Sequence, residues 1–230
     1  MSAGPSSPAT DSHRPSLRWC PLAFRSIAII DENVSAWLHS AKDHNKAFKA
    51  VVTLLSLSAD GWTGFLVLPV LSLYYGSGAT GWADVWDISL GSLLGTVLEF
   101  AIKVVARRPR PAVNTKKFWK WNPEKYSFPS GHTLRAGYVA ATLVCAGFPG
   151  SSDSSSHLGT VVLLLLWVCC VGMARTALGR HFPSDTLFGG LLGLGLAFLA
   201  YAFHVVEGIP YARLQDLRPA AGSLSELRLL

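Results

Sequence analysis

The chain has 230 residues, of which 50% are hydrophobic and only 15% are charged. A typical soluble domain has about 25% charged residues, so this composition argues against a water-soluble globular protein, and disordered chains are more polar still. Lys and Arg (20 residues) exceed Asp and Glu (14 residues), giving a net charge of +6. In so apolar a chain, this excess indicates cytosol-facing loops or a site that binds an anion.

The first quarter of the chain divides into two segments. Residues 1–23 are rich in Ser, Pro and Ala, which predicts a disordered N-terminal tail. Residues 24–57 predict interfacial amphipathic helices, because apolar residues such as Ile27, Ile30 and Val34 recur at helical spacing. Two lysines near the start of the second of these helices suit the level of lipid headgroups.

Residues 58–207 predict a transmembrane core, and polar residues 208–230 a C-terminal tail. A bilayer core of about 30 Å needs roughly 20 apolar residues per helix. Candidate spans are Gly61–Tyr75, Asp87–Val105, Gly131–Phe148, Leu158–Leu178 and the glycine-rich Ser184–Val206. The expected fold is therefore all-α: a multi-pass transmembrane helix bundle with N-terminal amphipathic helices. Two spans separate residues 107–130 from residues 179–183, so both loops should emerge on the same membrane face.

The first cluster of polar residues closes the second span. Lys103 ends an otherwise apolar helix, and Glu99 lies four residues earlier on the same helical face, where the two can pair. Arg110 stands between two prolines, so its planar guanidinium has a fixed direction, which suits phosphate oxygens. The simpler interpretation is that these cations only reach lipid headgroups.

The second cluster opens the third span with the sequence Pro-Ser-Gly-His. Ser130 is a good N-cap, and Gly131 lets the backbone approach a ligand closely. The free N–H groups of the first helical turn form an anion site, and His132 lies beside it. The simpler interpretation is a capped helix with an exposed histidine.

The third cluster joins the last two spans. Arg175 ends one span, Gly179 suits a C-terminal helix cap, and Pro183 suits the first turn of the next helix. His181 and Asp185 are four residues apart, so a helical path would bring them together. A carboxylate on one imidazole nitrogen fixes the tautomer and leaves the other nitrogen free to attack.

Together the clusters place cations, helix N–H groups and two histidines on one membrane face. A nucleophilic histidine with a carboxylate partner, and a second histidine as acid for the leaving oxygen, predict phosphoryl transfer through a phosphohistidine. The alternative for the third cluster is a His–Asp pair that merely caps a helix. We expect no metal or other cofactor, because the many Lys and Arg residues would repel a divalent cation.

These motifs resemble those of the type 2 phosphatidic acid phosphatase superfamily: K-x6-R-P, P-S-G-H and S-R-x5-H-x3-D. The resemblance covers residues 47–206 and departs at Ala174, where the family usually has a Ser that can contact phosphate. It implies that His181 is the nucleophile, Asp185 its orienting partner and His132 the proton donor to the leaving group. The resemblance also implies that the phosphate is held by Lys103, Arg110, Ser130, Gly131 and Arg175.

Within this superfamily, the string KYSFPSGHT and the short chain are similar to polyisoprenoid diphosphate phosphatases of the presqualene diphosphate type and to plant lipid phosphate phosphatases. This similarity implies hydrolysis of isoprenoid diphosphates and monophosphates, such as farnesyl, geranylgeranyl and presqualene diphosphate. Alternatives are a broad-specificity phosphatidic or lysophosphatidic acid phosphatase and, from another class, an inactive lipid-binding membrane protein. The implied partners are a lipid phosphate and the bilayer, not nucleic acid.

Charge also predicts the orientation. Beyond the motifs, the site face carries Arg107, Arg108, Lys116, Lys117, Lys120 and Arg180, whereas the opposite loops, around residues 77–84 and 149–157, carry no Lys or Arg. The positive-inside rule then places the site in the cytosol, in a multi-pass protein that we expect in the endoplasmic reticulum. Asn33 begins a glycosylation sequon that should stay unmodified in that orientation.

Overall fold

The structure is a computed structural model that describes residues 25–61, 82–114, 122–145 and 154–206. Its elements are α1 (Arg25–His44), α2 (Lys46–Ser58), α4 (Trp82–Ala106), the 3₁₀ helix η5 (Pro123–Lys125), α5 (Gly131–Cys145), α6 (Ser154–Ala177) and α7 (Pro183–Val206). Apart from one isolated bridge, these residues form no strand, and the predicted all-α class is confirmed. The tails predicted at residues 1–23 and 208–230 lie outside the described residues.

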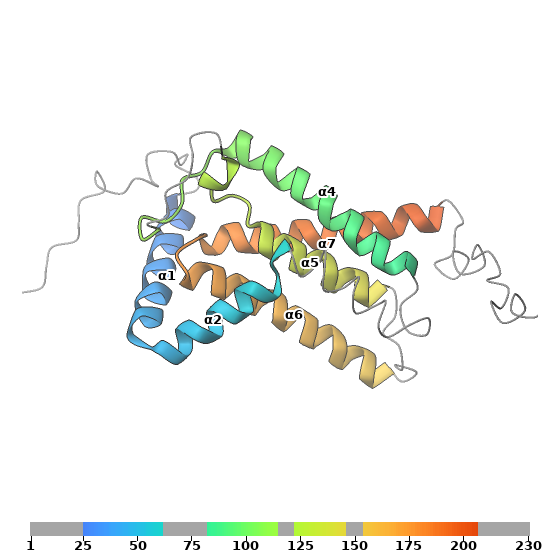
Figure 1. Ribbon diagram of the computed structural model, residues 1–230, viewed down its shortest axis with the longest axis horizontal. Coiled ribbons are helices and arrows are strands. Elements are labelled where there is room, and N and C mark those ends of the chain that lie inside the picture. The colour runs from blue at the N-terminus through green and yellow to red at the C-terminus, as the bar shows by residue number, and fades with distance from the viewer. Residues whose placement is uncertain (1–24, 62–81, 115–121, 146–153, 207–230) are drawn as a thin grey trace, which may run out of the picture.

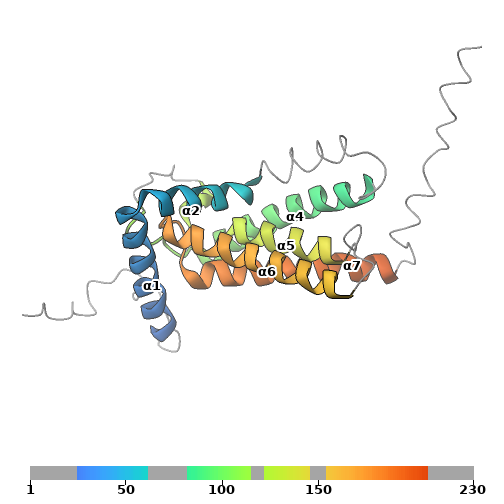
Figure 2. The same ribbon diagram turned by 90° about the horizontal axis from the view of Figure 1, so that it is seen from below.

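Helices α4, α5, α6 and α7 run side by side as a bundle, with α5 at its centre (Figures 1 and 2). Glycines allow the close approach of α5 and α7. A β-carbon on Gly193 would overlap the backbone carbonyl of Leu134, and one on Gly137 would overlap that of Gly190. The glycine-rich last segment therefore packs as predicted, by bringing two backbones into contact.

Three described helices are long and apolar enough to cross a membrane: Ser89–Ala106, Leu158–Ala177 and Pro183–Ala202. They match the second, fourth and fifth predicted spans. The first predicted span lies almost entirely outside the described residues. The third is represented by α5, whose 15 residues extend about 22 Å, less than a bilayer core of about 30 Å. The described part of α5 is thus shorter than a bilayer core, and the last residues of the predicted span, 146–148, lie outside the described residues.

The predicted N-terminal helices are present as α1 and α2. Asn45 separates them as the N-cap of α2, its side-chain oxygen accepting a hydrogen bond from the Phe48 amide at 3.0 Å. Figure 2 shows α1 crossing the end of the bundle at a steep angle to the other helices. Its buried residues are Ala28, Asp31, Ser35 and Lys42, while Ile30 and Trp37 remain 59% and 69% exposed.

The helix ends next to α1 follow the sequence signals. Gly179 has a positive φ of 67°, and the Arg180 amide donates to the Arg175 carbonyl at 3.1 Å, which is the bond of a glycine C-cap. Pro183 is the first residue of α7, as predicted. The connections after α4 and after α6 therefore meet at one end of the bundle (Figure 1), in agreement with the counting of spans.

Candidate active site

Backbone contacts join the three sequence clusters at this end of the bundle. Pro109 and Tyr126 form an isolated antiparallel bridge across the loop that follows α4. The Ser130 amide donates to the Asp185 carbonyl at 3.1 Å, which connects the start of α5 to the first turn of α7. The structure therefore brings all predicted site residues to one end of the bundle.

His181 is almost fully buried in the turn between α6 and α7. Its Nδ1 lies 2.7 Å from the carbonyl oxygen of Ser127. Because a carbonyl can only accept, Nδ1 carries the proton, and Nε2 keeps its lone pair. Nε2 lies 3.5 Å from Nη2 of Arg175. Burial, followed by the charges of Arg175 and Arg110, holds the pKa of His181 well below its usual value of 6.5, so the imidazole is neutral and can act as a nucleophile.

Asp185 does not form the predicted hydrogen bond with His181. One of its oxygens accepts from the Phe182 amide at 2.8 Å, and the other accepts from Nη1 of Arg108 at 2.7 Å. The expectation of a direct His–Asp pair was wrong because α7 begins only at Pro183, so no continuous helix runs between the two residues. Asp185 instead caps α7 from its third position, as in half of a capping box.

Arg108 extends this network to α1. Its Nη2 donates to Asp31 at 2.7 Å, and its guanidinium lies 4.4 Å from the ring centre of Phe182. Asp31 also accepts from the Ser184 amide at 2.9 Å. Sequence reasoning did not assign Asp31 to the site, because no motif surrounds it and only the fold brings α1 to the start of α7.

Two of the predicted phosphate-binding cations share a carboxylate that the sequence did not single out. Lys103, which is 1% exposed, donates to Glu99, as predicted, and to Glu124 at 2.8 Å. Arg110 donates to the other oxygen of Glu124 at 3.1 Å and to the Arg180 carbonyl at 2.8 Å. Burial alone would raise the pKa of Glu124, but Lys103 and Arg110 more than offset it, and the net pKa lies below the usual value.

Oγ of Ser130 and Nε of Arg175 are among the buried polar atoms that have no hydrogen-bond partner. Ser130 precedes α5 at the N-cap position, yet its hydroxyl does not cap the helix. A buried polar group without a partner costs about 1–3 kcal/mol. Both atoms lie at the start of α5 or beside His181, where an anion could satisfy them.

A β-carbon on Gly131 would overlap the Glu99 carboxylate, which would then have to move away from Lys103. The next residue, His132, lies in the first turn of α5. Its Nδ1 is 3.3 Å from Nη2 of Arg135, and its Nε2 is 3.7 Å from a carboxylate oxygen of Asp60. The charges of Lys103 and Arg175 lower the pKa of both His132 and His181, so the same cations lie close enough to both imidazoles to affect their protonation.

Ala174 faces away from this site. It is fully buried in an apolar cluster with Val52 and Ala177, against Leu38 and Phe48 of the N-terminal helices. A serine hydroxyl at this position would therefore meet apolar side chains, not phosphate.

The Arg175 guanidinium instead contacts a hydroxyl group on α2. Its Nη1 donates to Oγ of Ser56 at 2.9 Å, a contact that the motifs do not indicate. Among the residues that the structure describes, no group of three or more His, Cys, Asp or Glu is placed to hold a metal ion.

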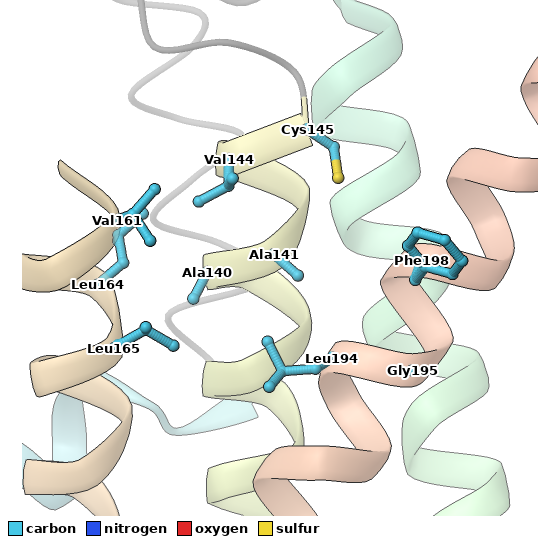
Figure 3. A pocket seen from close by; sticks show the side chains of 10 residues that line it. All are labelled: Ala140, Ala141, Val144, Cys145, Val161, Leu164, Leu165, Leu194, Gly195 and Phe198. Carbon is cyan, nitrogen blue, oxygen red and sulfur yellow. The ribbon is translucent and has the colours of Figure 1, made fainter. Parts of the chain in front are cut away.

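A cavity of about 400 Å³ lies between α5, α6 and α7 (Figure 3). It is apolar, with lining residues that include Ala141, Cys145, Leu165 and Phe198. The α5 residues among them, Ala141 and Cys145, lie in the later turns of that helix, whereas the site surrounds its first turn, so the cavity is separate from the polar cluster.

Comparisons with known proteins agree with this arrangement. The family model of the PAP2 superfamily matches residues 84–208. A probable lipid phosphate phosphatase beta of Arabidopsis thaliana is 29% identical over 77% of this chain and 90% of its own length. Phosphatidylglycerophosphatase B of Bacillus subtilis is 30% identical over 62% of this chain and 70% of its own. An undecaprenyl-diphosphatase of Sulfolobus acidocaldarius is 30% identical over 47% of each chain.

Two solved structures share the fold. A transmembrane PAP2-type phosphatidylglycerolphosphate phosphatase from Bacillus subtilis has a TM-score of 0.65 and 23% identity, over 85% of this chain and 92% of its own. LpxE from Aquifex aeolicus has a TM-score of 0.55 and 23% identity, over 74% and 93%. The bundle, the family match and the three motifs lead to one conclusion: the chain belongs to the PAP2 superfamily and is a membrane-bound phosphoric-ester hydrolase.

Proposed function

We propose that this protein hydrolyses isoprenoid diphosphates and monophosphates, such as farnesyl, geranylgeranyl and presqualene diphosphate, through a phosphohistidine intermediate. The observation that carries the proposal is the neutral, buried His181. Its Nε2 lies 3.5 Å from Nη2 of Arg175, whose Nε has no partner, and Oγ of Ser130, which precedes α5 at the same end of the bundle, also has none. A nucleophile beside unsatisfied donors is the arrangement that a phosphoryl group completes.

In the first step, Nε2 of His181 attacks the phosphorus atom and forms a P–N bond. The bond from phosphorus to the leaving oxygen breaks. Burial and Arg175 lower the pKa of His132 in the substrate-free protein, but the bound dianion offsets the cations and favours the protonated imidazole, so His132 supplies a proton to that oxygen. The Ser127 carbonyl holds the proton on Nδ1 of His181, which stabilises the positive charge that develops on the imidazole. Lys103, Arg110 and Arg175, with Ser130 and the Gly131 amide, balance the charge of the phosphoryl oxygens.

In the second step, water attacks the phosphorus atom and gives a proton to His132, now the base. The P–N bond breaks, and His181 returns to its neutral form as inorganic phosphate leaves. Positive side chains supply the charge stabilisation that a metal ion provides in other phosphatases, which supports a metal-independent reaction. Asp185 has no direct part in either step and keeps the nucleophile loop in place through Phe182 and Arg108.

The substrate class follows from where the site lies. The polar cluster is at the end of a bundle whose outer residues are apolar, so a lipid can leave its tail in the bilayer and bring only its headgroup to the cations. Each buried CH₂ contributes about 0.8 kcal/mol, so the tail supplies affinity without headgroup selectivity. The similarity to an undecaprenyl-diphosphatase supports isoprenoid substrates. The similarity to phosphatidylglycerophosphatase B favours, as a second candidate, a phosphatidic or lysophosphatidic acid phosphatase.

We also propose that the site faces the cytosol, in the membrane of the endoplasmic reticulum, on the charge asymmetry of the loops. Asn33 tests the orientation. It lies on an exposed part of α1, at the same end of the bundle as the site, so a cytosolic site leaves its sequon without glycan. A shift in gel mobility on glycosidase treatment that is lost in an Asn33→Gln variant would contradict the orientation.

The function is tested by phosphate release from detergent-purified protein with farnesyl diphosphate, farnesyl phosphate, phosphatidate and lysophosphatidate, with and without a chelator. We expect release from the isoprenoid substrates, unchanged by the chelator, and an acid-labile phosphoprotein that is absent in His181→Asn. Release from phosphatidate alone would select the second candidate. No release from any lipid would favour the inactive lipid-binding protein, and full activity of His181→Asn would refute the mechanism.

A further inference from the structure

We propose that Asp31, on the N-terminal helix α1, is a positioning residue that holds the nucleophile loop in its reactive geometry. The loop consists of residues 178–182, between α6 and α7. The proposal rests on the proposed function in one respect, the role of His181 as nucleophile. Asp31 lies outside the family match at residues 84–208, so this support comes from an element that the motifs do not include.

The Asp31 carboxylate is 2% exposed and fully engaged. It accepts from Nη2 of Arg108 at 2.7 Å and from the Ser184 amide at 2.9 Å, and it also accepts from the Ser184 hydroxyl. A carboxylate buried this deeply is stable only with such complete pairing, and removal of its charge leaves the partners unsatisfied. These contacts therefore form a specific buried network, unlike an ion pair formed by chance on the surface.

Two routes lead from Asp31 to the nucleophile. Through Arg108 it reaches Asp185, whose other oxygen fixes the Phe182 amide, and Phe182 directly follows His181. Through the Ser184 amide it binds one of the free N–H groups at the start of α7. The two routes hold the backbone amides of Phe182 and Ser184, which lie where the loop joins α7. Together they fix the first residue of α7 and the orientation of the His181 side chain.

Other contacts hold α1 in place without Asp31. His39 bonds to the Ala177 carbonyl at the end of α6, at 3.1 Å, and a β-carbon on Gly179 would lie 3.2 Å from the same imidazole. Leu38 packs against the apolar cluster around Ala174. Loss of the Asp31 charge should therefore disturb the loop while α1 stays docked, which makes the proposal testable in a folded protein.

The test compares Asp31→Asn with Asp43→Asn in the full-length protein. Both remove one carboxylate from α1, but Asp43 is 56% exposed, and its ion-pair partners among the described residues are Lys42 and His39. With farnesyl diphosphate, we expect kcat of Asp31→Asn to fall about 10- to 100-fold with KM changed less than about threefold, because the loss is in the reactive state. Asp43→Asn should keep wild-type values, and Asp31→Glu should recover part of the loss by restoring the charge.

A second measurement separates positioning of the nucleophile from a general loss of structure. Rapid-quench kinetics should show slower formation of the phosphoprotein in Asp31→Asn, by the same factor for an aryl and an alkyl phosphate. The melting temperature of Asp31→Asn should fall below that of the Asp43→Asn control, because the partners of the buried carboxylate lose its charge, but should stay above the assay temperature. Equal kcat in the two variants, or a loss explained by unfolded protein, would overturn the proposal. If wild-type protein formed no phosphoprotein, the proposed function itself would fail, which is a different outcome.

Discussion

Glu124 offers the sharpest test of the proposed phosphate site, because it forms ion pairs with two of the cations that we expect to bind the substrate. Its two oxygens contact Lys103 at 2.8 Å and Arg110 at 3.1 Å. A phosphate dianion must displace this carboxylate or bind beside it against its negative charge. We expect the Glu124→Gln variant, which keeps the shape and removes the charge, to bind inorganic phosphate more tightly than the wild type.

The size of the effect follows from exposure. The Glu124 side chain is 38% exposed, so solvent screens its two ion pairs, and each should be worth about 1 kcal/mol or less. Their sum of up to about 2 kcal/mol corresponds to an inhibition constant for phosphate that is lower by a factor of up to roughly 30. Lys103 keeps Glu99 as a partner, so the variant should remain folded.

The assay is competitive inhibition of lipid hydrolysis by inorganic phosphate, at constant ionic strength, with the exposed Asp43→Asn variant as control. The control should leave the inhibition constant unchanged, since Asp43 contacts none of these cations. Weaker inhibition of Glu124→Gln would mean that Glu124 orients the cations for phosphate and does not compete with it. An unchanged constant would place the phosphate away from Lys103 and Arg110, and would refute the site as described.

Three further outcomes follow from packing and titration. Gly131→Ala should overlap Glu99, at a cost of about 1–3 kcal/mol, and should lower phosphate release roughly tenfold or more without changing the oligomeric state on gel filtration. Ala174→Ser, although it restores the family motif, should not raise activity and should lower the melting temperature, since it places a hydroxyl against Val52. The lowered pKa of His181 means that the unfolded chain takes up a proton below about pH 6.5 while the folded chain does not. Its contribution to stability is thus complete above that pH and falls by up to about 1.4 kcal/mol per unit below it. The melting temperature of His181→Asn should therefore decrease less on acidification than that of the wild type, and an identical decrease would contradict the buried, neutral imidazole.

Local signals in the sequence predicted the elements well. Glycine and proline marked the end of α6 and the start of α7, because Gly179 adopts a positive φ and Pro183 needs no hydrogen-bond partner for its nitrogen. The Glu99–Lys103 pair followed from helical spacing alone.

The partners of the site residues could not be predicted in the same way. The acceptor for His181 is a backbone carbonyl, that of Ser127, and a carbonyl has no sequence signal, because every residue carries one. The spacing of His181 and Asp185 suggested a direct bond only on the assumption of a continuous helix. Asp31 and Ser56 reach the site from α1 and α2, and only the packing of these helices on the bundle reveals their partners.

The distribution of carboxylates indicates which cation has the greatest need of a bound phosphate as a counter-ion. Among the described residues, Lys103 pairs with Glu99 and Glu124, and Arg110 pairs with Glu124. Arg175 is buried with neutral neighbours, the hydroxyl of Ser56 and the imidazole of His181, and its Nε has no partner. Glu124 acts on Arg175 only at longer range. A buried charge without a paired carboxylate is costly, so we expect Arg175 to gain most from an arriving dianion. Because Arg175 also contacts Nε2 of His181, the position that balances its charge is the position from which the phosphorus atom meets the nucleophile.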